Sequence, residues 1–260
     1  LEIYRGPALE MTASERTCPF GIRYRRGAYD WKLGADEVAR SPLEGASSAQ
    51  DVLDHPWPKP QWFDLDPLVA EAERHAGRVV VSGFWTAIFG NAYRLHGFGN
   101  FLTNMALNPE LIKALVGRLS DFYLELNDRL FSALAGRAQV WYFGNDFGTQ
   151  GGLLFSRDMW REFFGEPYRL LAGLARRHGL KVMTHSCGAV AELIDDFLQT
   201  GIDILDPVQT TAAGMDPAGL KQRFGDRLVF HGGVDTQGVL PKGDEEAVRA
   251  HVRSLIGTLG

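Results

Sequence analysis

Cysteine is scarce in this sequence, and long apolar runs and an excess of positive charge are missing from it. The two cysteines, Cys18 and Cys187, cannot build a disulfide framework, which indicates a reducing, cytoplasmic location. No apolar run has the length that is needed to span a bilayer. The net charge of −5, with acidic and basic residues interspersed, argues against nucleic acid and anionic membrane surfaces as partners.

The sequence also lacks an initial methionine and a charged-then-apolar leader, so no signal peptide is visible. It starts at Leu1 and stops at Gly260 in the middle of readable patterns, and we expect it to be a fragment. Its composition is that of an ordinary globular protein, with 45% hydrophobic and 23% charged residues. Its 260 residues are about the length of one α/β barrel, which predicts one domain over 1–260.

Strands and helices alternate over residues 78–260, whereas residues 1–60 are irregular and rich in glycine, arginine, aromatic residues and proline. Within the irregular part, 21–29 alternates well enough to predict a strand or hairpin. Further on, apolar strands are expected near residues 80, 141, 183, 204 and 229, with helices between them. The longest helix is expected to start near Pro109, with an apolar face made of Leu111, Leu115, Leu119, Phe122, Leu126 and Leu130.

This alternation predicts βα units around a parallel sheet. A closed (β/α)₈ barrel needs eight strands, and only five can be read from the sequence. Either the sheet is open, or strands are missing at the two ends. In the second case the strands near residues 80 and 229 should have exposed edges that invite association.

Polar residues follow the predicted strands rather than precede them. In parallel α/β proteins the ligand crevice lies at the carboxyl ends of the strands, so this asymmetry predicts a site there. Four consecutive strands deliver Asp146, His185, Cys187, Asp206, Gln209, His231 and Asp235 to this rim.

His185 and Cys187 stand where a strand runs into Gly188 and then into a helix. Imidazole nitrogen and thiolate sulfur are ligands that suit zinc, and residues two apart on a strand share a face. Zinc bonds of ~2.3 Å to sulfur and ~2.1 Å to nitrogen require these two atoms within roughly 4 Å of each other. The alternative is a buried cysteine beside a hydrogen-bonded core histidine. A catalytic zinc site also needs a third protein ligand.

The other polar residues have a catalytic and a structural interpretation. Asp146 suits a base, a metal ligand or a substrate partner, but it also suits a turn. Asp206 precedes a proline, which is a common turn arrangement, and Gln209 could donate to a substrate carboxylate or carbonyl. His231 is either a ligand or a core histidine. We take Asp146, Asp206, Gln209 and Asp235 as the catalytic candidates.

A second group of residues is predicted to contact a cofactor. Gly83 opens an aromatic and basic stretch that includes Tyr93 and Arg94, and this stretch would suit a large, flat, anionic ligand. A lid or a subunit contact would produce the same pattern. Gly232 and Gly233 indicate either close approach of the backbone to a ligand or only a bend.

Taken together, several motifs resemble those of the uroporphyrinogen decarboxylase superfamily over about residues 78–260. They are Asn145-Asp-Phe-Gly-Thr-Gln150, His185-Ser-Cys-Gly188, Gly201-Ile-Asp-Ile-Leu-Asp-Pro-Val-Gln209, Gly214-Met-Asp216, Phe224-Gly-Asp226 and Phe230-His-Gly-Gly-Val-Asp235. The resemblance implies a (β/α)₈ TIM barrel with its cleft at the carboxyl ends of the strands. In this chain the barrel would be incomplete at both ends.

Within that superfamily, the sequence resembles the corrinoid-dependent methyltransferases of the methylcobamide:coenzyme M type more than the decarboxylases. The resemblance implies that His185 and Cys187 bind zinc, which lowers the pKa of a thiol acceptor for attack on a methyl group carried by a partner corrinoid protein. It places the third zinc ligand, a cysteine, beyond Gly260. Failing that, His231 and Asp146 are the nearest candidates.

Two other functions stay open at this point. One is decarboxylation of a tetrapyrrole without metal, although the Phe-Ser-Asp segment typical of the decarboxylases is not found here. The other is a non-catalytic barrel fragment that only binds. Zinc content would favour the methyltransferase, and tetrapyrrole turnover without metal would favour the decarboxylase.

Overall fold

The structure is a computed structural model that describes residues 3–26 and 36–260. The chain folds into two compact units. Unit 1 comprises residues 1–74 and 88–133, and unit 2 comprises residues 75–87 and 134–260. None of the helices in the described residues is both long and apolar enough to cross a membrane.

Unit 1 contains a small antiparallel sheet in the order β1-β2-β3 and most of the long helix α5. The strand predicted within 21–29 is found as β2, while residues 27–29 lie outside the described residues. The elements of this unit are β1 (Glu15–Thr17), β2 (Arg23–Arg26), β3 (Asp36–Arg40), α1 (Ala49–Leu53), the 3₁₀ turn η2 (Pro60–Trp62), α2 (Asp66–Arg74), α3 (Ile88–His96), α4 (Phe98–Leu107) and α5 (Pro109–Leu134).

Helix α5 forms the core of unit 1. The six apolar residues predicted along one of its faces, from Leu111 to Leu130, are all buried. The rings of Phe20 and Phe122 meet edge to face, 5.1 Å apart between centroids, and pack the N-terminal segment onto this face. Burial of these side chains stabilises a segment that has little regular structure of its own.

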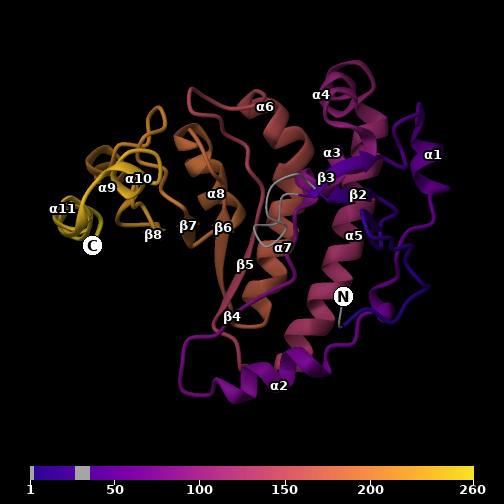
Figure 1. Ribbon diagram of the computed structural model, residues 1–260, viewed down its shortest axis with the longest axis horizontal. Helices are drawn as coiled ribbons and strands as arrows, with labels where there is room; N and C mark the ends of the chain where they lie inside the picture. The colour runs from indigo at the N-terminus through magenta and orange to yellow at the C-terminus, as the bar shows by residue number, and fades with distance from the viewer. Residues whose placement is uncertain (1–2, 27–35) are drawn as a thin grey trace. The chain divides into compact units, whose positions relative to one another are not determined.

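Unit 2 contains the predicted parallel sheet, in the order β4-β5-β6-β7-β8 (Figure 1). Its strands are β4 (Val81–Ser82), β5 (Val140–Gly144), β6 (Lys181–His185), β7 (Ile204–Asp206) and β8 (Val229–Phe230), all at the predicted positions. The sheet is therefore confirmed as five parallel strands within the described residues.

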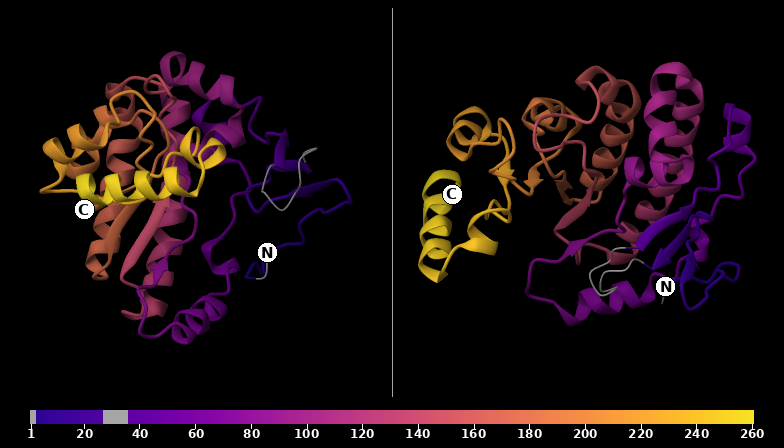
Figure 2. Two further views of the ribbon diagram at one scale, coloured as in Figure 1. Left: turned by 60° about the vertical axis from the view of Figure 1, so that its left-hand side comes forward. Right: turned by 45° about the horizontal axis from the view of Figure 1, so that its top comes forward.

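The helices of unit 2 connect these strands and follow the last one. They are α6 (Arg157–Trp160), the π-helical turn η3 (Arg161–Gly165), α7 (Glu166–Arg177), the 3₁₀ turn η4 (Ala191–Leu193), α8 (Ile194–Thr200), α9 (Pro217–Phe224), α10 (Val239–Lys242) and α11 (Glu245–Leu259). The π turn η3 lies between α6 and α7, directly before the first turn of α7, where Pro167 has no N–H to donate. Helices α9 and α11 pack on each other (Figure 2).

Alternation along β5 separates a core face from a polar face. Trp141 and Phe143 are fully buried and their rings stack 4.1 Å apart, while Tyr142, between them, points to the opposite face. Gly144 lies opposite His185 in the register of β5 and β6. A Cβ at Gly144 would lie 2.3 Å from the carbonyl oxygen of His185, so only glycine allows the two strand ends to approach so closely.

The outermost strands of the parallel sheet, β4 and β8, each pair with one neighbour among the described residues. Val79 and Val81 at one edge and Val229 at the other are all at least half exposed. These are the edges that the sequence predicted would be exposed. Unpaired backbone groups beside exposed valines are a template for association with another strand.

Candidate metal centre

The carboxyl ends of β5, β6 and β7 place their polar residues side by side. In the sheet register Gly144 pairs with His185, and His185 pairs with Asp206. The residues that follow each strand therefore leave the sheet at the same level. His185 and Cys187 share a face because they are two residues apart, and Asp146 reaches that face from the end of the neighbouring strand.

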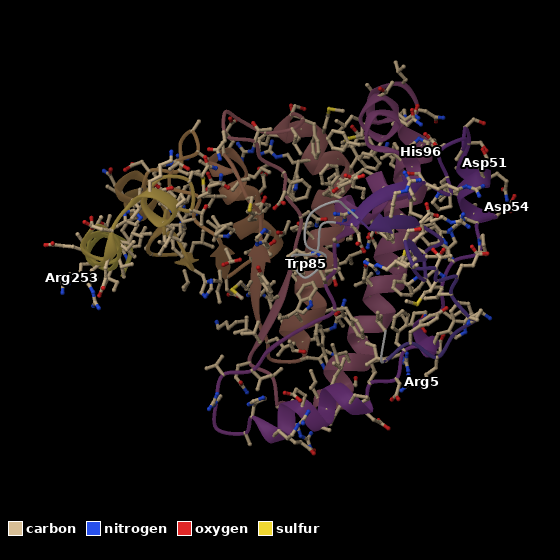
Figure 3. All side chains as sticks on the ribbon, in the orientation of Figure 1. Arg5, Asp51, Asp54, Trp85, His96 and Arg253 are labelled. Atoms are coloured by element: carbon tan, nitrogen blue, oxygen red, sulfur yellow. The ribbon has the colours of Figure 1, made fainter. Side chains whose placement is uncertain are left out.

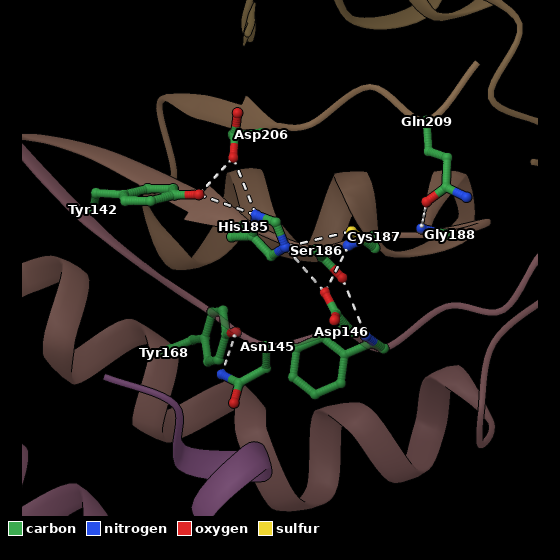
Figure 4. Close-up of polar contacts among 11 residues, drawn as sticks. Tyr142, Asn145, Asp146, Tyr168, His185, Ser186, Cys187, Gly188, Asp206 and Gln209 are labelled. Atoms are coloured by element: carbon green, nitrogen blue, oxygen red, sulfur yellow. Dashed lines mark hydrogen bonds and ion pairs between the residues drawn. The ribbon is translucent and has the colours of Figure 1, made fainter. Parts of the chain in front are cut away.

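Asp146, His185 and Cys187 form a compact group of three donors (Figure 4). The Sγ atom of Cys187 lies 3.4 Å from Nε2 of His185, and Oδ1 of Asp146 lies 3.2 Å from the same nitrogen. All three donor atoms lie within 4.8 Å of one another. The predicted approach of sulfur and ring nitrogen is therefore confirmed, while the binding of a metal stays a prediction.

Asp146, one of the two nearer candidates, supplies a third donor to the group, and a further ligand beyond Gly260 stays an untested expectation. The described residues already bring a third donor to His185 and Cys187. The backbone N–H of Cys187 donates to Oδ1 of Asp146 at 2.9 Å and holds the carboxylate against the other two donors. The Asp146 side chain is 58% exposed, so one side of the group remains open to solvent and to a ligand.

The other ring nitrogen of His185 faces a second set of polar groups. Its Nδ1 lies 3.1 Å from Oδ2 of Asp206 and 3.0 Å from the hydroxyl of Tyr142. That hydroxyl donates to the same Oδ2 at 2.6 Å. The second oxygen of Asp206 is 2.6 Å from Nδ1 of His231. Asp206 is thus shared by three side chains, which agrees with the predicted gathering of Asp146, Asp206 and His231 on one rim.

These contacts shift the pKa values of the group. Burial alone would lower the pKa of His185, but hydrogen bonds to Asp146 and Asp206 raise it to about 11. The hydrogen bond from His185 in turn holds the pKa of Asp146 below its usual value. Burial would raise the pKa of Asp206, yet hydrogen bonds from its three partners hold it well below the usual range. A metal ion at Nε2 would therefore have to displace a tightly held proton.

Gln209 supports the loop that carries Cys187. Its side-chain oxygen accepts the backbone N–H of Gly188 at 2.8 Å. Gly188 has a φ of 86°, and a Cβ there would lie 2.4 Å from the carbonyl carbon of Gly148. The sharp turn after Cys187 therefore needs glycine and a side-chain acceptor. The structure thus gives the Gln209 oxygen a local partner, whereas the sequence suggested contact with substrate.

Asp235 is engaged in a turn rather than in the donor group. Its carboxylate accepts backbone N–H groups of Gln237, Gly238 and Val239. Its own N–H donates to Nε2 of His251 at 3.1 Å. These local bonds account for an aspartate at this position without a catalytic role, because a short side chain that caps free N–H groups is what the turn requires.

The glycines predicted to approach a cofactor, Gly83, Gly232 and Gly233, all have positive φ, and at Gly83 close packing also requires glycine. At Gly83, with a φ of 146°, a Cβ would lie 2.6 Å from the ring of Trp141. Gly232 and Gly233 also have positive φ, and they lie against Pro207 and Leu255 respectively. The positive φ of this pair agrees with a bend, whereas approach of a cofactor to these glycines stays a prediction.

Tyr93 and Arg94 belong to α3 in unit 1. The guanidinium of Arg94 lies over the ring of Tyr93, 5.0 Å from its centroid, and that ring meets Phe98 edge to face. They form a local aromatic and cationic pair, and a cofactor contact for them stays a prediction.

The sequence reasoning missed Tyr142, and it placed Trp85 in the aromatic stretch after Gly83 without predicting its position beside His185. Trp85, labelled in Figure 3, follows β4. Its ring lies edge-on to Tyr142 and His185, at 5.4 and 5.5 Å between centroids. Its side chain is half exposed. Tyr142 was hidden in an apolar run, although alternation within β5 would have placed its hydroxyl on the face of Gly144 and His185.

Comparisons with known proteins agree with this architecture. The fold is similar to that of a methyltransferase from Methanosarcina mazei, with a TM-score of 0.63 and 20% sequence identity, over 92% of this chain and 67% of that chain. No curated protein is similar enough in sequence to be matched with this chain. Residues 67–259 match the sequence model of uroporphyrinogen decarboxylase (URO-D), and the chain therefore belongs to the uroporphyrinogen decarboxylase family.

Proposed function

We propose that this protein transfers a methyl group from a corrinoid, carried by a partner protein, to a small thiol, and that zinc binds at Asp146, His185 and Cys187. The observation that carries the proposal is the group of three donors at the carboxyl ends of β5 and β6. The protein of similar fold is a methyltransferase, and we therefore favour methyl transfer over the other chemistry of the family. The corrinoid and its carrier come from the resemblance of the His185–Gly188 motif to that of such enzymes.

The donor set fits zinc. One imidazole nitrogen, one sulfur and one carboxylate oxygen are all zinc ligands, and three protein ligands with an open side are typical of a catalytic zinc site. The exposure of Asp146 supplies that open side. When bound, zinc would lower the pKa of an acceptor thiol so that the thiolate is available near neutral pH.

The transfer itself needs little covalent chemistry from the protein. The sulfur–methyl bond forms as the cobalt–methyl bond breaks, both electrons of the broken bond stay on the corrinoid, and the thiol proton leaves to solvent. Asp206 keeps the ring of His185 in place through Nδ1, and the Gln209–Gly188 bond fixes the loop of Cys187. The half-exposed ring of Trp85 covers one flank of the site and would limit access of water.

We also propose that the five-stranded sheet is part of a (β/α)₈ barrel. Its strand order, its parallel pairing and the position of the donors at the carboxyl ends support this. The similar methyltransferase is longer, since the match covers 67% of that chain. The exposed edges of β4 and β8 are where further strands would pair.

The first experiment measures zinc and methyl transfer on the same preparation. The purified chain is dialysed, its zinc is quantified, and its affinity is measured by competition with a chromophoric chelator. Demethylation of methylcobalamin by a panel of small thiols is then followed by absorbance. We expect one zinc per chain and thiol-dependent demethylation, both lost in Cys187→Ala and both kept in Cys18→Ala, which changes a cysteine of unit 1. Absence of stoichiometric zinc would overturn the proposal.

A second candidate, decarboxylation of a tetrapyrrole, is favoured by the description of the family itself. It predicts turnover of uroporphyrinogen with a chelator present. In that case Cys187→Ala should keep activity, because the decarboxylation needs no metal. Binding of the tetrapyrrole without turnover, and without zinc, would instead indicate a non-catalytic chain.

A further inference from the structure

We propose that Tyr142, supported by His231, is a positioning residue that fixes which nitrogen of His185 is offered to a metal. This inference rests on the proposed zinc site, and it concerns residues on the side of His185 away from the donors. The carrying observation is the arrangement of hydrogen bonds around Asp206 (Figure 4).

The number of protons available determines how these three groups can bond to one another. A tyrosine hydroxyl has one proton, and in this site it is donated to Oδ2 of Asp206 at 2.6 Å. Only lone pairs of the hydroxyl therefore face Nδ1 of His185, 3.0 Å away. The carboxylate of Asp206, 3.1 Å from the same nitrogen, is an acceptor as well.

Nδ1 of His185 is therefore surrounded by two acceptors, and it must carry a proton to satisfy them. A neutral imidazole has one proton, so its lone pair then lies on Nε2. Nε2 is the nitrogen that lies 3.4 Å from Sγ of Cys187 and 3.2 Å from Oδ1 of Asp146. The carboxylate of Asp206 and the hydroxyl of Tyr142 thus together select the form of the ring that can join the donor group.

His231 completes the arrangement from the other side of the carboxylate. Its Nδ1 lies 2.6 Å from Oδ1 of Asp206, which leaves Oδ2 for Tyr142 and His185. With both oxygens engaged, the carboxylate cannot rotate away from the imidazole. The side chain of His231 is 62% exposed, so substitutions there disturb little of the core.

The first test is zinc affinity of Tyr142→Phe, which keeps the ring and removes only the hydroxyl. Removing a group that hydrogen-bonds to the other nitrogen of a metal-binding histidine typically lowers metal affinity by about 10- to 100-fold. We expect Tyr142→Phe to lose zinc affinity in that range. The matched control is Tyr123→Phe. Tyr123 is a buried tyrosine of α5 whose hydroxyl accepts a hydrogen bond from Asn91, so the variant also loses a buried hydroxyl. We expect its zinc affinity to equal that of the wild type.

Two further readouts separate positioning from general stability. Cobalt(II), bound in place of zinc, should give an altered visible spectrum in Tyr142→Phe, because the ring nitrogen is held less firmly. His231→Ala should weaken zinc binding. His231→Asn should bind zinc as the wild type does, since the amide nitrogen of asparagine is as many bonds from Cα as Nδ1 of histidine and can donate to Asp206. Thermal unfolding of every variant is compared with that of the wild type to check that each variant is folded.

The outcomes distinguish this inference from the proposed function. If the wild type binds no zinc, the proposed function fails and the positioning role fails with it. If the wild type binds zinc and Tyr142→Phe binds it equally well with an unchanged cobalt spectrum, the inference alone is overturned. Equal affinities of the Ala and Asn variants at position 231 would remove His231 from the arrangement.

Discussion

Two carboxylates of unit 2, Asp196 and Asp206, are each shared by several side chains, but their partners differ in kind. Asp196, on α8, is 5% exposed and accepts from the guanidinium groups of Arg157 and Arg161. Asp206, at the end of β7, is 15% exposed and is bonded to Tyr142, His185 and His231. Burial and the number of hydrogen bonds therefore do not separate the two sites.

The two carboxylates differ in whether their partners have a further polar atom that can bond elsewhere. A guanidinium stays charged and offers only donors, so the Asp196 group can only tie α8 to α6 and η3. Each histidine at Asp206 has a second ring nitrogen, and that of His185 faces Cys187 and Asp146. A shared carboxylate therefore indicates a functional site when a partner, such as His185, has a second polar atom that faces other donors. It indicates a purely structural interaction when the partners are guanidinium groups that only donate to it.

The largest expected effect breaks the donor group directly. Cys187→Ala should raise the dissociation constant for zinc by about a hundredfold or more, because two remaining donors hold zinc weakly. Competition with a chelator measures this constant. An unchanged affinity would mean that zinc binds elsewhere, and Cys18→Ala serves as the control.

Next in size, Asp196→Asn should lower the free energy of unfolding by about 1–3 kcal/mol, since hydrogen bonds to charged groups are lost beneath α8. The lower end is expected because both arginines are partly exposed. Urea unfolding gives the value. Zinc affinity should stay that of the wild type, and a loss of zinc would contradict the separation of the two carboxylates.

The third effect is on the pH dependence of zinc binding. The pKa of His185 is raised to about 11, so at neutral pH zinc must displace a proton from Nε2. The apparent affinity should therefore rise with pH, with His185 contributing about tenfold per pH unit below that pKa. Titrations from about pH 6.5 to 8.5, a range that lies below that pKa, measure the slope. A flat profile would show that zinc does not compete with this proton.

The smallest effect is expected at the edges of the sheet, away from both carboxylates. Val81→Lys and Val229→Lys should leave the free energy of unfolding within about 0.5 kcal/mol, as surface substitutions usually do. They should reduce self-association, because a charged side chain on an edge strand discourages pairing with another strand. Sedimentation velocity over a range of concentrations compares them with the wild type, and stronger association of the variants would oppose this view of the edges.

Much of the fold of unit 2 could be predicted, because local periodicity determines which residues form a strand and which face each residue occupies. The five strands follow from short apolar runs with helices between them, and the placement of His185 and Cys187 on one face follows from alternation. The same reasoning could not recognise Asp235 as a turn cap, or Gly83 as a packing glycine. Those roles depend on atoms of neighbouring loops and strands that no local pattern identifies.

The sequence by itself determined that a histidine and a cysteine would leave one strand end together, since side chains two residues apart on a strand point the same way. Only the tertiary structure decided that Asp146, 41 residues before Cys187, would be the third donor. The same holds for the hydroxyl of Tyr142 beside Nδ1 of His185. The reason is that the register between parallel strands is set by the packing of the whole sheet, in which Gly144 allows β5 to approach His185 closely.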